Sequence, residues 1–511
     1  MRKVPDCLYV TGLSSVLVAA MFMLQGNIGI NLADEGYLWY GTIQTYLGEV
    51  PLLDFQSYDP GRYYWSAFWF KVFGDTSMLT LRIAVMLFLV MGLTCALLAV
   101  RRLTKSWWHL LVIGILLLLW IYPRHKIFDM SICMIAVYMV ILLLENPKQL
   151  RYLCSGIVIG LAAFIGSNHG LYVSIAFAIT CIYIFLKIDK EEFLKRIGMM
   201  GLGIIIGYSP RLLMFIFIPG LFENFINTLI WLLKMGSTNL PLPTPWPWRV
   251  DFAQLSTMDG IREVIIGIFF ILMVIWPIFW IIYAFVAKKA NLYIIAAAFV
   301  ALPYAHVAFS RADLGHLAQS ISPLLLGICF FALEYFKNNK KRLVIFLVGM
   351  LSISYLSIVR VQPLYQKLIA PSTEFVNYTI THNNLWIDVH SANFIQTVES
   401  IKSKHLKEGE KFFVAPHSPT LYPILNITSP IWDIYLLFPE TEERQYEQIK
   451  EMQEKNVTLV LLGDIALDNR EELRFRNTHP ILWEYFNQYY EEILVGNLPS
   501  NYILLRYTEA E

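Results

Sequence analysis

The chain has 511 residues, 57% of them hydrophobic and only 15% charged, and its mean hydropathy is +0.53. Because soluble chains average about 25% charged residues, this chain cannot cover its surface with charge in water. Its 40 basic and 39 acidic residues give a net charge of +1, which excludes nucleic-acid binding through bulk positive charge and an acidic disordered chain. The cysteines form no CxxC motif, so neither a disulfide framework nor a zinc ribbon is indicated. The composition indicates a polytopic membrane protein.

Eleven apolar segments have about the length that a helix needs to cross ~30 Å of hydrocarbon. The first of them follows Met1-Arg2-Lys3, as a signal peptide would, but it is long and no small-residue cleavage site precedes the loop at Asn31. We therefore interpret it as a signal anchor. The expected membrane helices are 8–29, 78–100, 107–123, 127–144, 152–167, 169–186, 197–218, 263–286, 291–309, 317–336 and 342–359.

Two features inside these segments bear on helix packing. Small residues recur four apart in Gly156-Ile-Val-Ile-Gly160 and Gly203-Ile-Ile-Ile-Gly207, a pattern typical of close helix contact in membranes. Arg211 follows Pro210 within the apolar segment 197–218. A charge there costs at least about 2.5 kcal/mol on insertion scales, so we expect Arg211 to face a cavity or a partner.

Lysine and arginine are divided unequally between alternate loops. One set of short loops contains 17 of them, whereas the opposite set, although longer in total, contains eight. Cytoplasmic loops carry the excess of basic residues, so we place the N-terminus in the cytoplasm and the chain beyond about Arg360 outside. We expect a multi-pass protein of the cytoplasmic (inner) membrane, with a transmembrane domain at 1–360 and a periplasmic or extracellular domain at 361–511.

The polar C-terminal part is typical of a small α/β domain. Lys411–Ala415 and Val457–Leu462 are rich in β-forming residues, and a charged helix is expected between them at 440–455. This alternation predicts parallel strands in a covered sheet. The loops that follow the two strands could bind a ligand, or the domain could be a lid or scaffold. The predicted fold is an all-α polytopic membrane protein of about eleven helices with a C-terminal extracytoplasmic α/β domain.

The first outer loop, 30–77, concentrates acidic and aromatic residues. Asp34 and Glu35 lie within a few residues of the membrane exit, and Asp59 and Arg62 flank a Pro-Gly turn in Tyr58-Asp-Pro-Gly-Arg-Tyr63. Two juxtamembrane helices are expected here, since Tyr and Trp favour the membrane interface. Two interpretations are open at this point. The loop is either an interfacial hairpin whose carboxylates cap its helices, or part of a functional site.

Further charged residues recur in the other loops on the same side of the membrane. Interfacial snorkelling explains any one of them alone. Together they predict a mixed-charge cavity in which cations hold a phosphate and a carboxylate takes a proton from an incoming hydroxyl. The cations are Arg62, Arg124, His125, Lys126, His169, Arg311 and His316, and the acids are Asp34, Glu35, Asp59, Asp129 and Asp313.

With Asp34-Glu35 opening the first outer loop and Tyr58-Asp-Pro-Gly-Arg-Tyr63 behind them, the chain resembles the GT-C superfamily of membrane glycosyltransferases. More narrowly, it looks like the bacterial protein O-mannosyltransferase-like and aminoarabinose-transferase-like branch. The resemblance implies transfer of a sugar from a polyprenyl-phosphate donor to a glycan, lipid or protein acceptor at the outer membrane face. The loop motif differs from the Glu-Lys-Pro of aminoarabinose transferases, so neither that sugar nor lipid A can be carried over.

The resemblance also implies roles for individual residues. Asp34 falls on the general base, and Glu35 would orient it or bind the acceptor. Arg62 falls on the cation at the donor phosphate, and the acid at the start of the fourth segment falls on Asp129. By placement we add Arg124, His125, Lys126 and Arg311 to donor-phosphate binding, and Tyr58, Asp59, Asp129, His169, Asp313 and His316 to substrate binding.

The sequence leaves other functions and the cofactor open. No Walker loop, HExxH, GxSxG or EF-hand pattern occurs, so ATP-driven transport and zinc proteolysis lack support. No metal ligands are assigned, although some GT-C enzymes use a divalent metal. The first alternative is a transporter or flippase for a lipid-linked sugar, against which the lack of an internal repeat counts. The second is a non-catalytic scaffold whose outer domain recruits partners. We expect sugar and acceptor specificity to lie in the Pro- and Trp-rich loop 219–262 and in the C-terminal domain.

Overall fold

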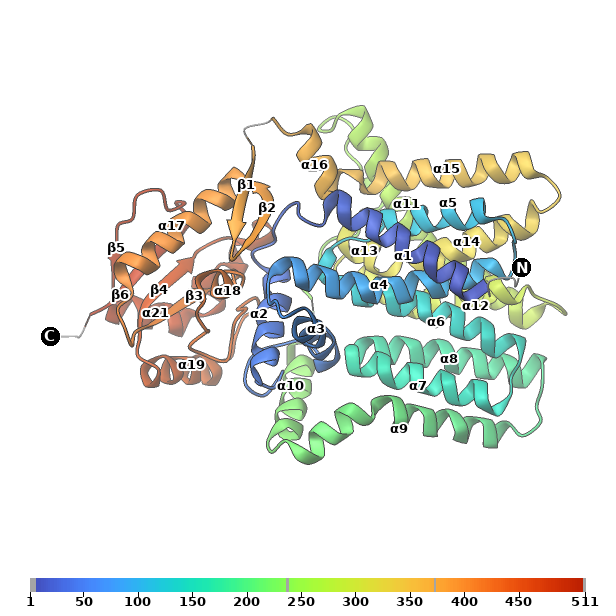
Figure 1. The fold of residues 1–511 in the computed structure, drawn as a ribbon, viewed down its shortest axis with the longest axis horizontal. Coiled ribbons are helices and arrows are strands. Elements are labelled where there is room, and N and C mark those ends of the chain that lie inside the picture. The colour runs from blue at the N-terminus through green and yellow to red at the C-terminus, as the bar shows by residue number, and fades with distance from the viewer. Residues whose placement is uncertain (1–5, 236–238, 372–373, 509–511) are drawn as a thin grey trace. The chain divides into compact units, whose positions relative to one another are not determined.

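The computed structural model describes residues 6–235, 239–371 and 374–508 (Figure 1). The chain forms two compact units, and both are assembled from segments distant in sequence. The first contains the residues up to Gly26 together with Arg82–Gln366, and the second contains Asn27–Leu81 together with the residues from Lys367 onward. The first outer loop therefore belongs to the same unit as the C-terminal segment. The boundary at residue 360 between a membrane domain and an extracytoplasmic domain stays a prediction.

Apolar helices dominate the first unit. In the described part of the chain, eight helices are long and apolar enough to cross a membrane, or nine if one bent pair counts as a single span. The eight are α1 (Asp6–Gln25), α4 (Met78–Arg101), α6 (Ile127–Glu145, preceded by the 3-10 turn η1, Arg124–Lys126), α8 (Ser167–Lys187), α9 (Phe193–Phe217), α11 (Thr257–Val286), α12 (Leu292–Ser310) and α15 (Lys340–Ile358, followed by η3, Val359–Val361).

The remaining apolar helices depart from simple spans. α5 (Trp107–Leu119) and α7 (Gln149–Ile165) have 13 and 17 residues. α13 (Leu314–Ser320) and α14 (Ser322–Tyr335) meet at an angle of 56°, because Pro323 in the first turn of α14 cannot continue the hydrogen bonding of α13. Each of the eleven expected segments coincides with one of these helices or with the bent pair. The polytopic membrane fold is confirmed, whereas the exact number of spans stays a prediction, as does the orientation, for which Arg2 and Lys3 lie outside the described residues.

The two glycine motifs lie at one helix–helix contact. A Cβ atom at Gly156 or Gly160 would overlap the backbone of α9, and one at Gly203 or Gly207 would overlap the backbone of α7. The backbones therefore approach as closely as small residues allow, which in hydrocarbon is the main source of helix association. The predicted packing role of both motifs is confirmed.

Three further elements complete this part of the chain: α10 (Leu221–Met235), η2 (Pro247–Arg249) and α16 (Pro363–Ile369).

The second unit combines two helices of the first outer loop with an α/β segment. The helices are α2 (Asp34–Leu47) and α3 (Pro60–Phe73). The α/β segment contains β1 (Phe375–Ile380), β2 (Asn383–Asp388), α17 (Val389–His405), β3 (Lys411–Ala415), α18 (Leu421–Leu425), α19 (Glu442–Glu454), β4 (Val457–Gly463), η4 (Leu467–Asn469), η5 (Glu471–Leu473), α20 (Phe475–Thr478), α21 (Pro480–Tyr489), β5 (Tyr490–Ile493) and β6 (Tyr502–Tyr507).

The main sheet has the strand order β3-β4-β6-β5 (Figure 1). β3 and β4 are parallel, as the sequence predicts, and α19 lies between them in the chain. β6 pairs antiparallel with both β4 and β5, so the sheet is mixed. Its core includes the fully buried Phe413, Val460 and Leu462. β1 and β2 form a separate antiparallel hairpin. The predicted C-terminal α/β domain is confirmed.

Close packing fixes the first turns of α2. A Cβ at Gly36 would overlap the backbone of Thr420, whose N–H donates to the carbonyl of Leu32 at 3.1 Å and whose hydroxyl donates to that of Asn31 at 3.0 Å. Further along, Gly41 faces the ring of Tyr63 on α3, and a side chain at Gly41 would overlap it. These contacts place the acidic start of α2 against both α3 and the C-terminal domain.

Candidate active site

The acidic pair of the first outer loop forms the first turn of α2. Asn31 organises this turn, because its carboxamide oxygen accepts the N–H groups of Ala33 and Asp34 at 2.9 and 2.8 Å. No side-chain cap is formed at the start of α2 or of α3, where Asp59 occupies the cap position. The interpretation of these carboxylates as helix caps is therefore wrong. Glu35 is buried and Asp34 half-buried.

Aromatic side chains surround Asp34 and Arg62. The hydroxyl of Tyr435, from the C-terminal domain, donates to Oδ1 of Asp34 at 3.1 Å. The ring of Tyr37 lies 4.8 Å from that of Tyr58 and 5.6 Å from that of Tyr435. The guanidinium carbon of Arg62 lies 4.6 Å from the centre of the Tyr58 ring, a cation–π contact. One tyrosine cluster therefore contacts the acid and the cation that the sequence singled out.

Burial controls the ionisation of this cluster. It raises the pKa of Tyr37 well above the ordinary tyrosine value, so the Tyr37 phenol stays neutral. His417, whose ring lies 5.7 Å from that of Tyr435, has its pKa lowered to about 4 by burial, against the opposing attraction of Asp34. The His417 imidazole beside this cluster is thus uncharged at neutral pH.

A second group of the expected residues lies in the first unit, at the start of α6 and α8. His169 Nε2 lies 3.0 Å from Oδ1 of Asp129, and both side chains are almost fully buried. His169 Nδ1 lies 3.2 Å from the hydroxyl of Tyr304 on α12. Asp129 and Tyr304 therefore flank the two ring nitrogens of the imidazole. In η1, His125 is buried and Arg124 and Lys126 are half-buried.

A third group forms the turn between α12 and α13. Arg311 Nε donates to Oδ2 of Asp313 at 2.8 Å, and an Nη of Arg311 donates to the carbonyl of Leu240 at 3.1 Å. Oδ1 of Asp313 accepts the N–H of His316 at 2.8 Å and lies 2.9 Å from its Nδ1. Although burial opposes it, this hydrogen bonding and the charges of His316 and Arg311 hold the pKa of Asp313 below its ordinary value.

Arg211 is fully buried on α9. Its guanidinium carbon lies 4.9 Å from the centre of the Phe215 ring and 4.8 Å from that of Phe225 on α10. The expected partner is therefore at least partly aromatic. In the described ranges 6–235, 239–371 and 374–508, no group of three or more His, Cys, Asp and Glu side chains is placed to hold a metal ion.

The sequence did not indicate Tyr435, His417 or Gln56. Tyr435 lies 401 positions from Asp34, outside any helix or strand. The only local signal was the position of His417 after β3, where a doubly wound sheet binds ligands. The expected residues themselves fall into the two units, with Asp34, Glu35, Tyr58, Asp59 and Arg62 in the second and the others in the first.

The fold of the whole chain has solved counterparts. It is similar to ArnT from Cupriavidus metallidurans bound to undecaprenyl phosphate, with a TM-score of 0.52 and 11% identity over 99% of both chains. The apo state of that protein gives a TM-score of 0.50 at 10% identity over 97% of both chains. The chain has the GT-C fold. This confirms, for the fold, the resemblance that begins at Asp34-Glu35.

The fold is also similar to that of a second GT-C protein, but the match covers less of that protein's length. The apo oligosaccharyltransferase of Archaeoglobus fulgidus gives a TM-score of 0.50 at 10% identity, over 99% of this chain and 75% of that one. No model of a protein family matches the chain, and no curated protein matches it. The identities are too low to transfer a sugar, an acceptor or a residue role, so these must be argued from the side chains.

Proposed function

We propose that the protein is a membrane glycosyltransferase that moves a sugar from a polyprenyl-phosphate donor to a hydroxyl of a glycan, lipid or protein acceptor, at the outer face of the cytoplasmic membrane. The carboxylate of Asp34, held by the phenol of Tyr435 in one tyrosine cluster with Arg62, carries this proposal. The GT-C fold supports it, as does the undecaprenyl phosphate bound by the ArnT to which the chain is similar.

The reaction requires a base and a site for a leaving phosphate. Asp34 accepts the proton of the acceptor hydroxyl while the acceptor oxygen attacks the anomeric carbon of the sugar. A new carbon–oxygen bond forms as the bond between that carbon and the donor phosphate oxygen breaks, with inversion at the carbon. Polyprenyl phosphate leaves with the bonding electron pair. General-base help of this kind contributes about 10²–10⁴-fold.

Cations stabilise the charge that develops on the leaving phosphate. We assign this role first to Arg62, since the Tyr58 ring directs its guanidinium without cancelling its charge. Arg124, His125, Lys126 and Arg311 are further candidates by position. Asp129, His169, Asp313 and His316 would bind substrate, together with Tyr58 and Asp59, and Glu35 would orient the base or the acceptor. Stabilisation of the developing charge is often the largest contribution to catalysis.

Undecaprenyl phosphate is the first probe, because it tests the phosphate site without knowledge of the sugar. A ligand at 100 times its dissociation constant adds about 2.7 kcal/mol of stability. We expect it to raise the melting temperature of the detergent-purified protein and of Asp34→Asn, and to raise that of Arg62→Gln far less. Arg476→Gln is the matched control, since Arg476 also lies over an aromatic ring, at 5.3 Å from that of Trp483.

A panel of polyprenyl-phosphate sugars then identifies the donor and the chemistry. The sugar whose donor stabilises the protein most should be transferred by the wild type and not by Asp34→Asn. Flipping of that donor across liposomes by Asp34→Asn at the wild-type rate, without transfer by either protein, would replace this proposal with a flippase. Absence of stabilisation by every polyprenyl phosphate would leave a scaffold as the function.

A further inference from the structure

The residue that contacts Asp34 from the C-terminal domain lies in a loop. Tyr435 belongs to the segment between α18 and α19, in a stretch without helix or strand. A loop residue has no ladder of backbone hydrogen bonds to fix it, so its side chain is positioned only if other contacts hold the backbone. The structure shows such contacts on both sides of the loop.

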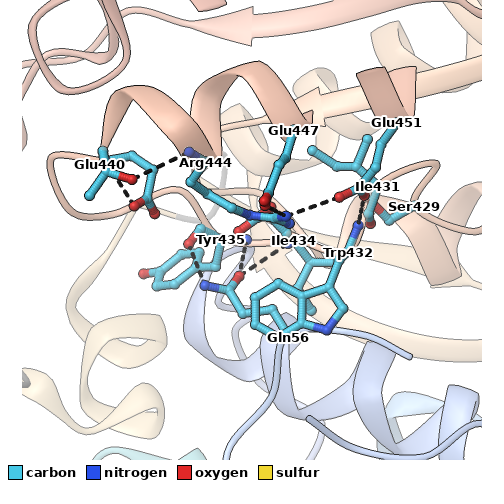
Figure 2. Close-up of polar contacts among 12 residues, drawn as sticks. Gln56, Ser429, Ile431, Trp432, Ile434, Tyr435, Glu440, Arg444, Glu447 and Glu451 are labelled. Atoms are coloured by element: carbon cyan, nitrogen blue, oxygen red, sulfur yellow. Dashed lines mark hydrogen bonds and ion pairs between the residues drawn. The ribbon is translucent and has the colours of Figure 1, made fainter. Parts of the chain in front are cut away.

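Gln56, between α2 and α3, holds the loop from one side (Figure 2). Its Oε1 accepts the N–H groups of Ile434 and Tyr435 at 3.1 and 2.9 Å, and its Nε2 donates to the carbonyl of Tyr435 at 3.2 Å. The backbone N–H of Gln56 also donates to the carbonyl of Trp432 at 2.9 Å. A single glutamine therefore satisfies both backbone groups of Tyr435.

Arg444, on α19, holds the same loop from the other side (Figure 2). Its guanidinium pairs with the buried Asp433 at 2.5 Å, with Glu447 at 2.8 Å and with Glu451 at 3.1 Å. Glu451 in turn accepts the N–H of Trp432 at 2.8 Å. The residues on either side of Ile434 are thus anchored, one to the first outer loop and one to α19.

We propose that Tyr435 is a positioning residue for the base Asp34, that Gln56 and Arg444 hold it in place, and that the C-terminal domain thereby completes the catalytic site. This inference rests on the proposed function. Packing alone would be served by a phenylalanine, whereas the hydroxyl is directed at a carboxylate oxygen. The bond to Oδ1 orients the carboxylate and favours its ionised form, the form that accepts a proton from the acceptor hydroxyl.

The groups around Asp34 define what a change at Tyr435 would report. Glu35 adjoins it on α2, Tyr37 lies on the same helix, and His417 approaches from the loop after β3. Asp433, paired with Arg444, lies two residues before Tyr435 in the same loop, and Arg62 contacts the Tyr58 ring of the tyrosine cluster. Tyr435→Phe leaves all these groups in place and removes one donor to the carboxylate.

The first test measures the protonation of Asp34 without a substrate. Carbodiimide modifies the protonated carboxyl, and mass spectrometry of the purified full chain follows labelling at Asp34 against pH. Loss of a donor to the ionised form raises the pKa of a carboxyl, so Tyr435→Phe should move the labelling midpoint up by about one pH unit. Tyr378→Phe is the matched control, because it removes a phenol that donates to Glu399 at 2.8 Å in the same domain. It should leave the Asp34 midpoint unchanged.

The second test measures transfer with the donor chosen by the stability panel. Tyr435→Phe should lower kcat about tenfold or more, as for a lost hydrogen bond to a charged group. The acidic limb of the pH profile of kcat should move to higher pH together with the labelling midpoint. KM for the donor should stay at the wild-type value. Gln56→Ala should shift the labelling profile and the pH profile of kcat in the same direction as Tyr435→Phe does. Gln56→Glu keeps the two acceptor bonds, so it should shift both profiles less than Gln56→Ala.

The outcomes separate this inference from the proposed function. An unchanged midpoint and pH profile in Tyr435→Phe, with Asp34→Asn inactive, would overturn the role of Tyr435 and leave the base in place. A loss of activity in Tyr435→Phe without a shift of either profile would make Tyr435 merely structural, which also overturns it. Transfer by Asp34→Asn would instead remove the proposed base itself. Should Tyr435→Phe fail to fold, the Gln56 pair decides by the same readouts.

Discussion

The two units hold their candidate site residues in different ways. In the second unit, Asp34 accepts a bond from a neutral phenol and Arg62 lies over an aromatic ring. In the first unit, Asp129 is paired with His169, and Asp313 lies against both Arg311 and His316. The phenol of Tyr435 gives Asp34 a directional bond without adding a charge, whereas the guanidinium of Arg311 brings a compensating charge to Asp313. We therefore expect residues of the second unit to carry the chemistry and the pairs of the first unit to position substrate.

Asp34→Asn should produce the largest effect. The amide cannot accept the proton of the acceptor hydroxyl, so transfer should fall about 10²–10⁴-fold in a radiolabelled-sugar assay. Donor-induced stabilisation should remain near that of the wild type. Asp54→Asn is the control, because Asp54 lies in the same outer loop and accepts the N–H of Val50 at 2.7 Å. A loss of less than tenfold in Asp34→Asn would mean that another group takes the proton.

Asp129→Asn and His169→Gln should have intermediate effects. Both residues belong to one buried pair, so each substitution disturbs the same arrangement and leaves a polar group without its partner. We expect each single variant to lose transfer by about ten- to a hundredfold and the double variant to lose little more, because paired residues are not additive. A double-mutant cycle on kcat/KM measures this coupling. A loss in Asp129→Asn as large as that in Asp34→Asn would place the base in the first unit and reverse the comparison.

The same comparison shows what the sequence could predict. Membrane helices follow from long apolar runs, because every backbone group in hydrocarbon must be satisfied within its own helix. The two glycine motifs and β3 and β4 follow from equally local patterns. The sequence singled out Asp34 and Arg62 as candidates because their motifs are local and resemble those of a family. α5 ends at Leu119 and not at the expected residue 123, because the backbone leaves the helical geometry at Trp120, ahead of Pro123.

The contacts that position Asp34 could not be predicted in this way. Gln56 contacts Ile434 and Tyr435 across almost 380 positions of sequence, through three side-chain hydrogen bonds between two loops. Such bonds have no periodicity and no characteristic composition. β5 and β6 escaped the analysis for a related reason, since the pairing of β6 with β4 and of β5 with β6 follows from the return of the chain to the sheet. Tertiary geometry, and not local pattern, therefore decides which residues surround Asp34.

Substitution of Asp313, in the turn between α12 and α13, should give the smallest effect. It tests the comparison through a charged pair of the first unit. Asn is as good a helix cap as Asp, so Asp313→Asn keeps the bond to the N–H of His316 and removes the charge facing Arg311. Because the pKa of Asp313 is lowered in the folded protein, its carboxylate stabilises the fold above its unfolded pKa and ceases to do so as the pH falls through the folded value.

The melting temperature of Asp313→Asn should accordingly lie below that of the wild type at pH 7, by an amount equivalent to about 1 kcal/mol or less for a half-buried pair that solvent still screens. The two melting curves should converge as the pH is lowered below 4. Transfer should change only a few-fold, because the charges of this turn compensate one another. If Asp313→Asn instead abolishes donor-induced stabilisation while the melting temperature without donor is unchanged, the turn between α12 and α13 binds the donor phosphate directly. The first unit would then carry chemistry as the second does.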